Sequence, residues 1–215
     1  MSTLGIVNLP VFMLAVLLLN MTPGPDTAYI VGRSVSQGRV AGLMSSLGVS
    51  AGCCVHVLAV AFGLTALLAA SAVAFTVIKA IGAAYLIYLG GRMLLAPAGR
   101  DDAPVAEAVA TARRPLRALF MQGFLTNVLN PKVVLFFLSF FPQFVDPGAR
   151  HKAAAFLVLG AVFIVMSTAW NSLVAWVAAS VTRRVAGKPG IKRWLDRVVG
   201  TAFIGLGARL AFTTR

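Results

Sequence analysis

The sequence predicts an all-α membrane protein with six transmembrane helices, and three observations lead to that fold class. Of its 215 residues, 59% are hydrophobic and only 12% are charged, whereas about 25% of the residues in soluble domains are charged. Apolar stretches of about 20 residues, the length that crosses a bilayer as a helix, recur along the chain. Within these stretches the apolar residues are continuous and do not alternate with polar ones, which favours helices over the strands of a membrane barrel.

Six spans are expected, near residues 5–36, 40–68, 72–95, 117–144, 153–181 and 194–213. The first is similar to the core of a signal peptide, but no Lys or Arg precedes it and no small-residue cleavage site follows, so we expect it to be retained. The spans divide the chain into a first three-helix half (1–95), a polar cytoplasmic linker (96–116) and a second three-helix half (117–215). An odd number of spans per half makes the second half insert upside down, as in the inverted repeats of many secondary transporters.

The basic residues behind the net charge of +13 are distributed unevenly among the predicted loops. One side of the predicted topology carries most of the basic loop residues: Arg33, Arg39, Arg92, Arg100, Arg113, Arg114, Arg117, Arg183, Arg184, Lys188, Lys192 and Arg193. The other side carries Arg150, Lys152 and Arg215. Because basic loops stay in the cytoplasm, we expect both termini on the periplasmic side. A nucleic-acid site would instead show basic residues interleaved with aromatic residues in one patch, so no nucleic-acid partner is expected.

The first and fourth spans are expected to be discontinuous helices. Each contains asparagine and proline deep in an apolar run, in the segments 19–26 and 127–132. Proline has no amide hydrogen, so in a helix it leaves the carbonyl group four residues earlier without a partner. The prolines Pro23, Pro25 and Pro131 thus free the carbonyls of Leu19, Met21 and Asn127. Unpaired backbone groups at membrane depth are tolerated only inside protein or at a hydrated cavity, so the two breaks are predicted to face each other near the bilayer midplane.

Three ionisable residues in the spans are candidates for that site. Asp26 is the one acidic residue placed deep within a span. A charge there is costly and indicates function, and the alternative is a favourable charge at a helix N-terminus. Lys132 can bind a substrate carboxylate, neutralise Asp26, or extend its ammonium group to the membrane surface. His56 is either a hydrogen-bonded structural group or a proton relay. For all three residues these interpretations stay open.

Enzyme and metal chemistry find little support in the sequence. The segment Gly48-Val49-Ser50-Ala51-Gly52 matches the pattern of serine hydrolases, but the strand-to-helix turn is missing and His56 lies on another face of the helix from Ser50. Gly48, Gly52 and His56 share one face, which predicts close helix packing. The sequence has no H-E-x-x-H, Walker loop or clustered metal ligands, and the adjacent Cys53 and Cys54 are not a C-x-x-C pair. We therefore expect no cofactor and no metal, and an intramembrane serine protease is a minor alternative.

Several short segments, in this order and spacing, resemble the LysE/RhtB family of amino-acid exporters over nearly the whole chain. They are Pro23-Gly24-Pro25-Asp26, Ser36-Gln37-Gly38-Arg39 with Gly42-Leu43 and Gly48, Tyr85-Leu86-Ile87-Tyr88-Leu89-Gly90, Gly123-Phe124-Leu125-Thr126-Asn127, Asn130-Pro131-Lys132, and Pro142-Gln143-Phe144-Val145-Asp146-Pro147. The resemblance implies an exporter in the bacterial inner membrane, driven by an ion gradient, for amino acids or derivatives such as lysine, arginine, threonine, homoserine or its lactone. Apart from Asp196 at the very start of the last span, no further acidic residue lies in a span to receive a cationic side chain, which favours the threonine and homoserine branch. An exporter of another small solute on the same scaffold is the alternative.

The resemblance and the broken helices together predict how a zwitterionic amino acid binds. The freed carbonyls and Asp26 hold its ammonium group, and the amide groups after Pro25, with Lys132, hold its carboxylate. Proton entry at Asp26 then releases the substrate outside, and His56 is the second candidate for proton coupling. The predicted substrate-binding residues are Pro23, Gly24, Pro25, Asp26, Thr27, Asn127, Asn130, Pro131 and Lys132. The expected partners are the amino acid, protons and the lipid bilayer, and a homodimer is one assembly compatible with the sequence.

Overall fold

The computed structural model describes residues 4–64 and 113–180, together with the single positions 73, 77, 80, 84 and 88. Apart from these positions, the predicted third span lies outside the described residues, and so does the predicted sixth span. The same holds for most of the linker 96–116 and for the basic loop after the fifth span. The division into two three-helix halves and the inverted repeat therefore stay predictions.

The described elements are helices, arranged as two bent pairs and two long helices. The first bent pair consists of α1 (Leu9–Met21) and α2 (Pro25–Gln37). The second consists of α7 (Leu116–Val128) and α8 (Pro131–Phe140), which continues into the 3-10 turn η3 (Phe141–Phe144). The long helices are α3 (Arg39–Leu58), extended by the π-helical η2 (Ala59–Leu64), and α9 (Lys152–Ser180). These bounds nearly coincide with the predicted first, second, fourth and fifth spans.

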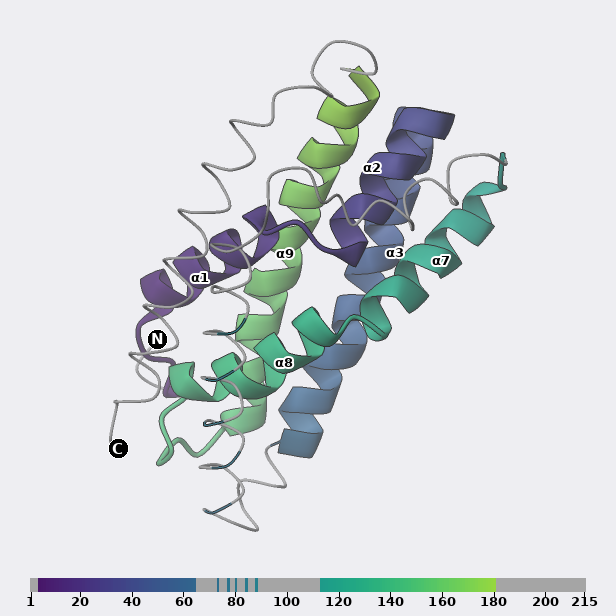
Figure 1. Ribbon diagram of the computed structural model, residues 1–215. Coiled ribbons are helices and arrows are strands. Elements are labelled where there is room, and N and C mark those ends of the chain that lie inside the picture. Colours follow the sequence, from purple (N-terminus) through teal and green to yellow (C-terminus); the bar gives the residue numbers. More distant parts are fainter. Residues whose placement is uncertain are drawn as a thin grey trace.

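The described helices are compatible with a membrane protein that crosses the bilayer several times. The segments Arg39–Gly63 and Lys152–Ser180 are long and apolar enough to cross a membrane, and the number of candidate spans rises to four if each bent pair is one span. The bend is 54° between α1 and α2 and 50° between α7 and α8 (Figure 1). The predicted interruption of the first and fourth spans is thus confirmed. In each pair the second helix begins at a proline, a position where the missing amide hydrogen breaks no helical hydrogen bond.

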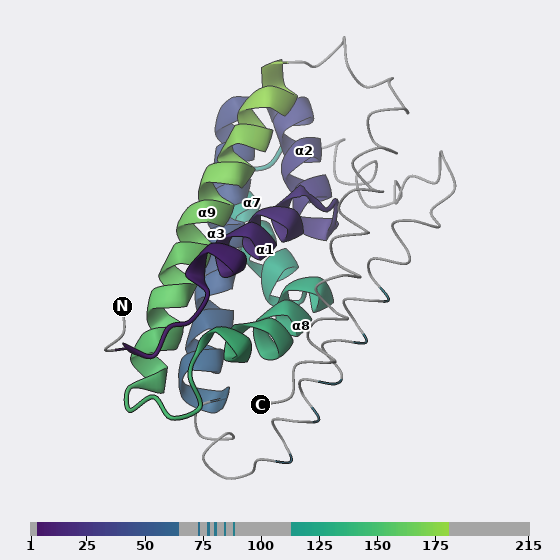
Figure 2. The same cartoon turned by 90° about the vertical axis from the view of Figure 1, so that its left-hand side faces the viewer.

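Helices α3 and α9 run antiparallel along the length of the bundle, and the bent pairs pack against them (Figures 1 and 2). Glycines allow helix α3 to approach α7 closely. A Cβ atom on Gly48 would overlap the carbonyl of Phe120, and one on Gly52 would lie 2.8 Å from the side chain of Asn127. Such contacts between small residues and backbone are typical of membrane helices. The packing interpretation of the Gly48 and Gly52 face is confirmed.

The two ends of the bundle are closed in different ways. At one end, α2 and α3 are joined by Gly38, whose φ of 87° is a backbone conformation that favours glycine. At the other end, residues near the start of the chain pair with those after η3. Val7 donates to the carbonyl of Phe144 at 2.9 Å, and Asp146 donates through its amide to the carbonyl of Gly5 at 2.8 Å. A cluster of buried phenylalanines packs behind this contact, formed by Phe12, Phe136, Phe137, Phe140, Phe141, Phe144 and Phe163.

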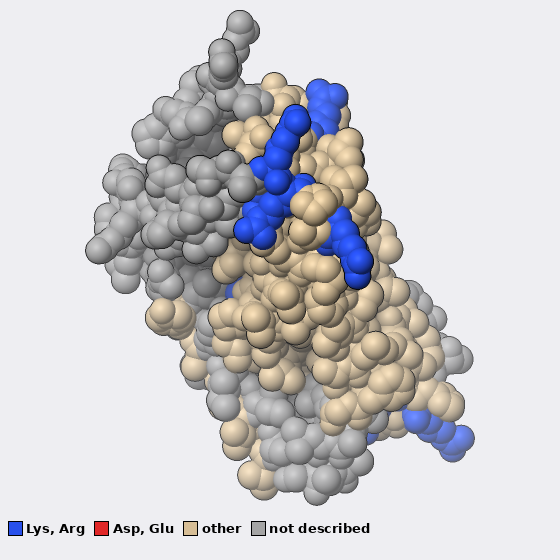
Figure 3. Space-filling model, turned by 90° about the vertical axis from the view of Figure 1, so that its right-hand side faces the viewer, with Lys and Arg blue, Asp and Glu red and all other residues tan. Residues whose placement is uncertain are grey.

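The basic residues are distributed unevenly between these two ends. Arg39 and Arg114 belong to the end with the Gly38 turn, where Gln37 donates to the carbonyl of Arg114 and Arg39 donates to Ser180 at the end of α9. Figure 3 shows Lys and Arg gathered at this end of the face it displays. Arg33 is the exception. It was predicted in a loop, but it lies within α2 and is only 1% exposed, because the side-chain oxygens of Gln37 and Gln122 accept its hydrogen bonds.

Candidate functional site

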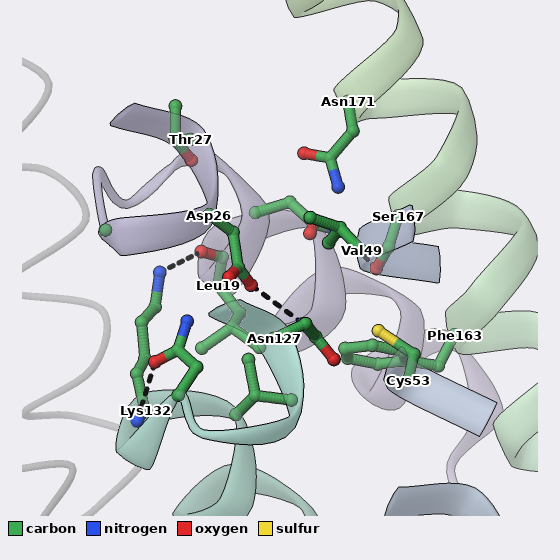
Figure 4. A pocket seen from close by; sticks show the side chains of 14 residues that line it. Leu19, Asp26, Thr27, Val49, Cys53, Asn127, Lys132, Phe163, Ser167 and Asn171 are labelled. Carbon is green, nitrogen blue, oxygen red and sulfur yellow. Dashed lines mark hydrogen bonds between the residues drawn. The ribbon is translucent and has the colours of Figure 1, made fainter. Parts of the chain in front are cut away.

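The breaks of the two bent pairs are in direct contact, and hydrogen bonds from donors in the second break to acceptors in the first join them (Figure 4). From the second break, Asn127 donates through Nδ2 to Oδ2 of Asp26 at 2.8 Å. Lys132 donates through Nζ to the carbonyl oxygens of Leu19 and Thr22, also at 2.8 Å each. Residues about 100 positions apart in the sequence thus form one polar cluster, as the pairing of two broken helices led us to expect.

Asp26 lies in the first turn of α2, directly after Pro25. The partial positive charge at a helix N-terminus favours a carboxylate there, so the helix-start interpretation and a role in the site are compatible. Only one of its oxygens is paired. Oδ1 of Asp26 and Oδ1 of Asn127 are buried and accept no hydrogen bond from a residue in the described part of the chain. Buried polar atoms nearly always have a partner, so this pair of acceptors is suited to receive donors from a bound molecule.

Of the three roles that the sequence left open for Lys132, the binding of a substrate carboxylate stays a prediction. Lys132 forms no ion pair with Asp26, although the structure describes both residues, and its ammonium points inward onto the break of α1 and α2. Lys132 lies in the first turn of α8, where the positive end of its own helix dipole disfavours a cation. The C-terminal carbonyls of α1 carry the opposite partial charge and attract it. Because Pro23 has no amide hydrogen, the carbonyl of Leu19 is available to this ammonium group.

The carbonyl that Pro131 frees is occupied by other donors. The oxygen of Asn127 accepts from the amide of Asn130 at 2.9 Å and contacts Nε2 of His56 at 3.1 Å. His56 is only 8% exposed and its ring packs against Phe137, with 5.6 Å between centroids. A hydrogen bond to a carbonyl requires the proton on Nε2. His56 therefore contacts Asp26 only indirectly, through Asn127.

A small cavity lies beside this cluster, with a volume of about 30 Å³, room for about two water molecules. Of the residues predicted to bind substrate, Gly24, Asp26, Thr27, Asn127, Asn130 and Lys132 line it. The prolines Pro23, Pro25 and Pro131 do not line it and are exposed; they shape the breaks. The remaining lining residues are Leu19, Asn20, Val49, Cys53, Val133, Phe163, Ser167 and Asn171.

Sequence reasoning did not identify Phe163 and Ser167 of α9 as part of the cavity lining. Phe163, Ser167 and Asn171 lie four residues apart in turn and therefore share one face of that helix. Asn20 donates to Ser167 at 3.1 Å and ties this face to α1. The spacing of the two polar residues in an apolar helix was the available signal. Cys53 is buried and also lines the cavity.

The alternative chemistries are not supported by the described residues. The hydroxyl of Ser50 contacts Thr168 at 2.6 Å and donates to the carbonyl of Ser46, so it has no general base beside it. Within residues 4–64 and 113–180, no group of three or more His, Cys, Asp or Glu side chains is arranged to hold a metal ion.

Comparisons with known proteins match this chain over nearly its full length. The sequence profile of the LysE type translocator family matches residues 17–214. An uncharacterized membrane protein of Pseudomonas aeruginosa is 32% identical over 214 residues, covering 100% of this chain and 99% of that protein. The leucine efflux proteins of Klebsiella pneumoniae and Salmonella typhimurium are 30% and 28% identical, each over 96% of both chains. No solved structure matches the chain.

Proposed function

Because the chain belongs to the LysE type translocator family, we propose that it is a secondary-active exporter of neutral amino acids in the bacterial inner membrane, with leucine as the first candidate substrate. The chain is a transporter and not an enzyme. Leucine is proposed because relatives that align over nearly the whole chain are leucine efflux proteins. Threonine and homoserine, favoured by the sequence, become second candidates.

One observation carries the proposal of a neutral substrate. Among the described residues, those that line the cavity include one carboxylate, Asp26, and one ammonium group, Lys132, and the others are neutral. A zwitterionic amino acid brings one charge of each sign, so these two groups match its two ends. A lysine or arginine substrate would bring a second cation, for which the lining offers no second carboxylate.

The unpaired acceptors indicate how each end of the substrate binds. Its ammonium group takes the buried Oδ1 atoms of Asp26 and Asn127 as acceptors. Its carboxylate accepts from Lys132, which has three N–H donors and uses two of them on Leu19 and Thr22. The apolar side chain packs near Val49, Val133 and Phe163. A leucine molecule does not fit into about 30 Å³, since ligand pockets usually exceed about 300 Å³. The structure is therefore a closed state, and substrate entry requires the bent pairs to move apart.

A proton gradient is the proposed energy source. Protonation of Asp26 removes the charge that attracts the substrate's ammonium group, so a proton arriving from outside releases the substrate there. We propose that the end with Arg39 and Arg114 faces the cytoplasm, because basic residues concentrate there. The end with the buried phenylalanines and both chain termini then face the periplasm.

The test is leucine efflux from proteoliposomes, measured with and without an imposed proton gradient. Asp26→Asn keeps the shape of the side chain but cannot carry its charge, and we expect it to abolish gradient-driven efflux while the protein is still produced and folded. The matched control is Asp146→Asn. Asp146 carries an exposed carboxylate in the turn that follows η3, where it accepts from the amide of Gly148. His56→Gln, measured beside these variants, separates the two interpretations of His56: retained coupling indicates a structural role, and lost coupling a proton relay. Undiminished gradient-driven efflux in Asp26→Asn would exclude the proposed role of Asp26.

A further inference from the structure

The ammonium group of Lys132 is held by backbone, away from the carboxylate of Asp26. Two opposite charges that line one small cavity would ordinarily be expected to pair, since their attraction is strong where water is scarce. A closed ion pair between them would leave neither charge for a zwitterionic substrate. The two carbonyl oxygens at the end of α1 prevent this, because they supply Lys132 with two hydrogen bonds of 2.8 Å.

This carbonyl pair exists because of the first break. Pro23 cannot donate to Leu19 as a helical residue would, so the carbonyl of Leu19 accepts from Lys132 beside the amide of Thr22, which lies at 3.2 Å. The chain at Thr22 is extended, and its carbonyl accepts from Lys132 as well. Gly24 adds no side chain between these carbonyls and Lys132. A Cβ atom placed on Gly24 would lie 3.5 Å from Cδ and 3.6 Å from Nζ of Lys132, so the stem of Lys132 passes directly over this glycine.

We propose that Pro23 is a positioning residue for substrate recognition, which acts by freeing the carbonyl that holds Lys132 apart from Asp26. Lys132 then presents its third N–H to the carboxylate of the substrate, while Asp26 receives the ammonium group. This inference rests on the proposed function, because it assumes a zwitterionic substrate. It adds a separate claim to that function, namely that recognition of the substrate's carboxylate depends on Pro23 only through Lys132.

The readout is the preference for leucine over 3-methylbutylamine, the same molecule without its carboxylate, as competitors of labelled leucine in proteoliposomes. Lys132→Met is expected to reduce this preference by at least about tenfold, the loss that accompanies a missing charge-assisted hydrogen bond. Pro23→Ala returns an amide hydrogen that competes for the carbonyl of Leu19, and we expect it to reduce the preference in the same direction. In the Lys132→Met background, Pro23→Ala is expected to have no further effect, because the residue it acts through is already gone.

Pro10→Ala is the matched control. It makes the same change at an exposed proline in the first turn of the same helix α1, whereas Lys132 donates to Leu19 and Thr22 at the other end of that helix. It should leave the preference for leucine unchanged. An equal effect of Pro23→Ala with and without Lys132, or no effect of Pro23→Ala at all, would overturn the inference.

A variant outside the first break keeps the test decisive if Pro23→Ala does not fold. Lys132→Arg retains the charge, but its longer planar guanidinium cannot take the same position on two carbonyls and reaches toward Asp26. We expect it to lose the preference as Lys132→Met does, and full preference in Lys132→Arg would show that charge alone suffices. If the wild-type protein moves no leucine, the proposed function fails; if it moves leucine but these variants behave otherwise, only the inference fails.

Discussion

The two breaks have similar bends but are stabilised in different ways. The second break is satisfied mainly from within its own half: the side chain of Asn130 caps α8 by accepting from the amide of Lys132 at 3.0 Å, and the amide of Asn130 returns to the carbonyl of Asn127. The first break has no such cap. Gly24, the residue before α2, offers no side chain, and the carbonyl of Thr22 depends on Lys132 from the opposite break, whereas that of Leu19 accepts from both Lys132 and the amide of Thr22.

This difference suggests that the two breaks have different roles in transport. A break that satisfies its own backbone keeps its geometry when its neighbours move, whereas a break held by a partner loses hydrogen bonds when the two separate. We infer that the second break is the anchor and that the first break opens during the transport cycle.

The largest effect is expected at Asn127, the residue through which the anchor holds Asp26. Asn127→Leu removes the hydrogen bond to the carboxylate, at a cost of about 1.5–3 kcal/mol for a bond to a charged group. We expect a loss of that size in the free energy of unfolding in detergent, together with loss of leucine efflux. Asn171→Leu is the control, because Asn171 lies on the cavity wall without a hydrogen bond to Asp26. Equal losses in the two variants would mean that Asn127 does not anchor Asp26.

A smaller effect is expected at the cap of the anchor. Asn130→Ala removes the side-chain oxygen that caps α8 and should lower the free energy of unfolding by about 1 kcal/mol, the usual value of an N-cap. Asn130→Ser keeps a capping oxygen and should recover most of that loss. Chemical unfolding in detergent measures both variants. If serine proves no better than alanine, the cap contributes nothing and the second break is not stabilised from within.

The sequence predicted the parts of this site that follow from single residues. A proline without an amide hydrogen must interrupt a helix or start one, so the breaks at Pro23 and Pro131 were predictable. The partners that fill the freed carbonyls were not, because they come from elsewhere in the chain. Lys132 reaches Leu19 across 113 positions, and no local rule identifies that pairing.

Arg33 shows the same limit of sequence-based prediction, because its partner is also distant in the chain. A cation next to a predicted loop is normally assigned to the loop, and its burial becomes tolerable only with the oxygen of Gln122, 89 positions away. Phe163 and Ser167 in the lining from α9 were missed for a related reason. Ser167 and Asn171 interrupt an apolar helix with the right spacing for one face, but only the folded arrangement shows that this face meets Asn20 and the cavity.

The smallest effect tests whether the first break opens because it lacks a cap. Gly24→Ser gives α2 the side-chain oxygen that the second break already has, and its Cβ meets Lys132 only at an ordinary contact distance of 3.5 Å. Serine is the better N-cap, so we expect a gain of a few tenths of a kcal/mol in the free energy of unfolding. If opening of this break limits turnover, a barrier raised by the same few tenths of a kcal/mol should slow leucine efflux by at most about twofold. Gly24→Ala adds the Cβ atom without the cap and should gain no stability. A serine variant that is more stable than the alanine variant yet transports faster than the wild type would show that the first break does not need to open.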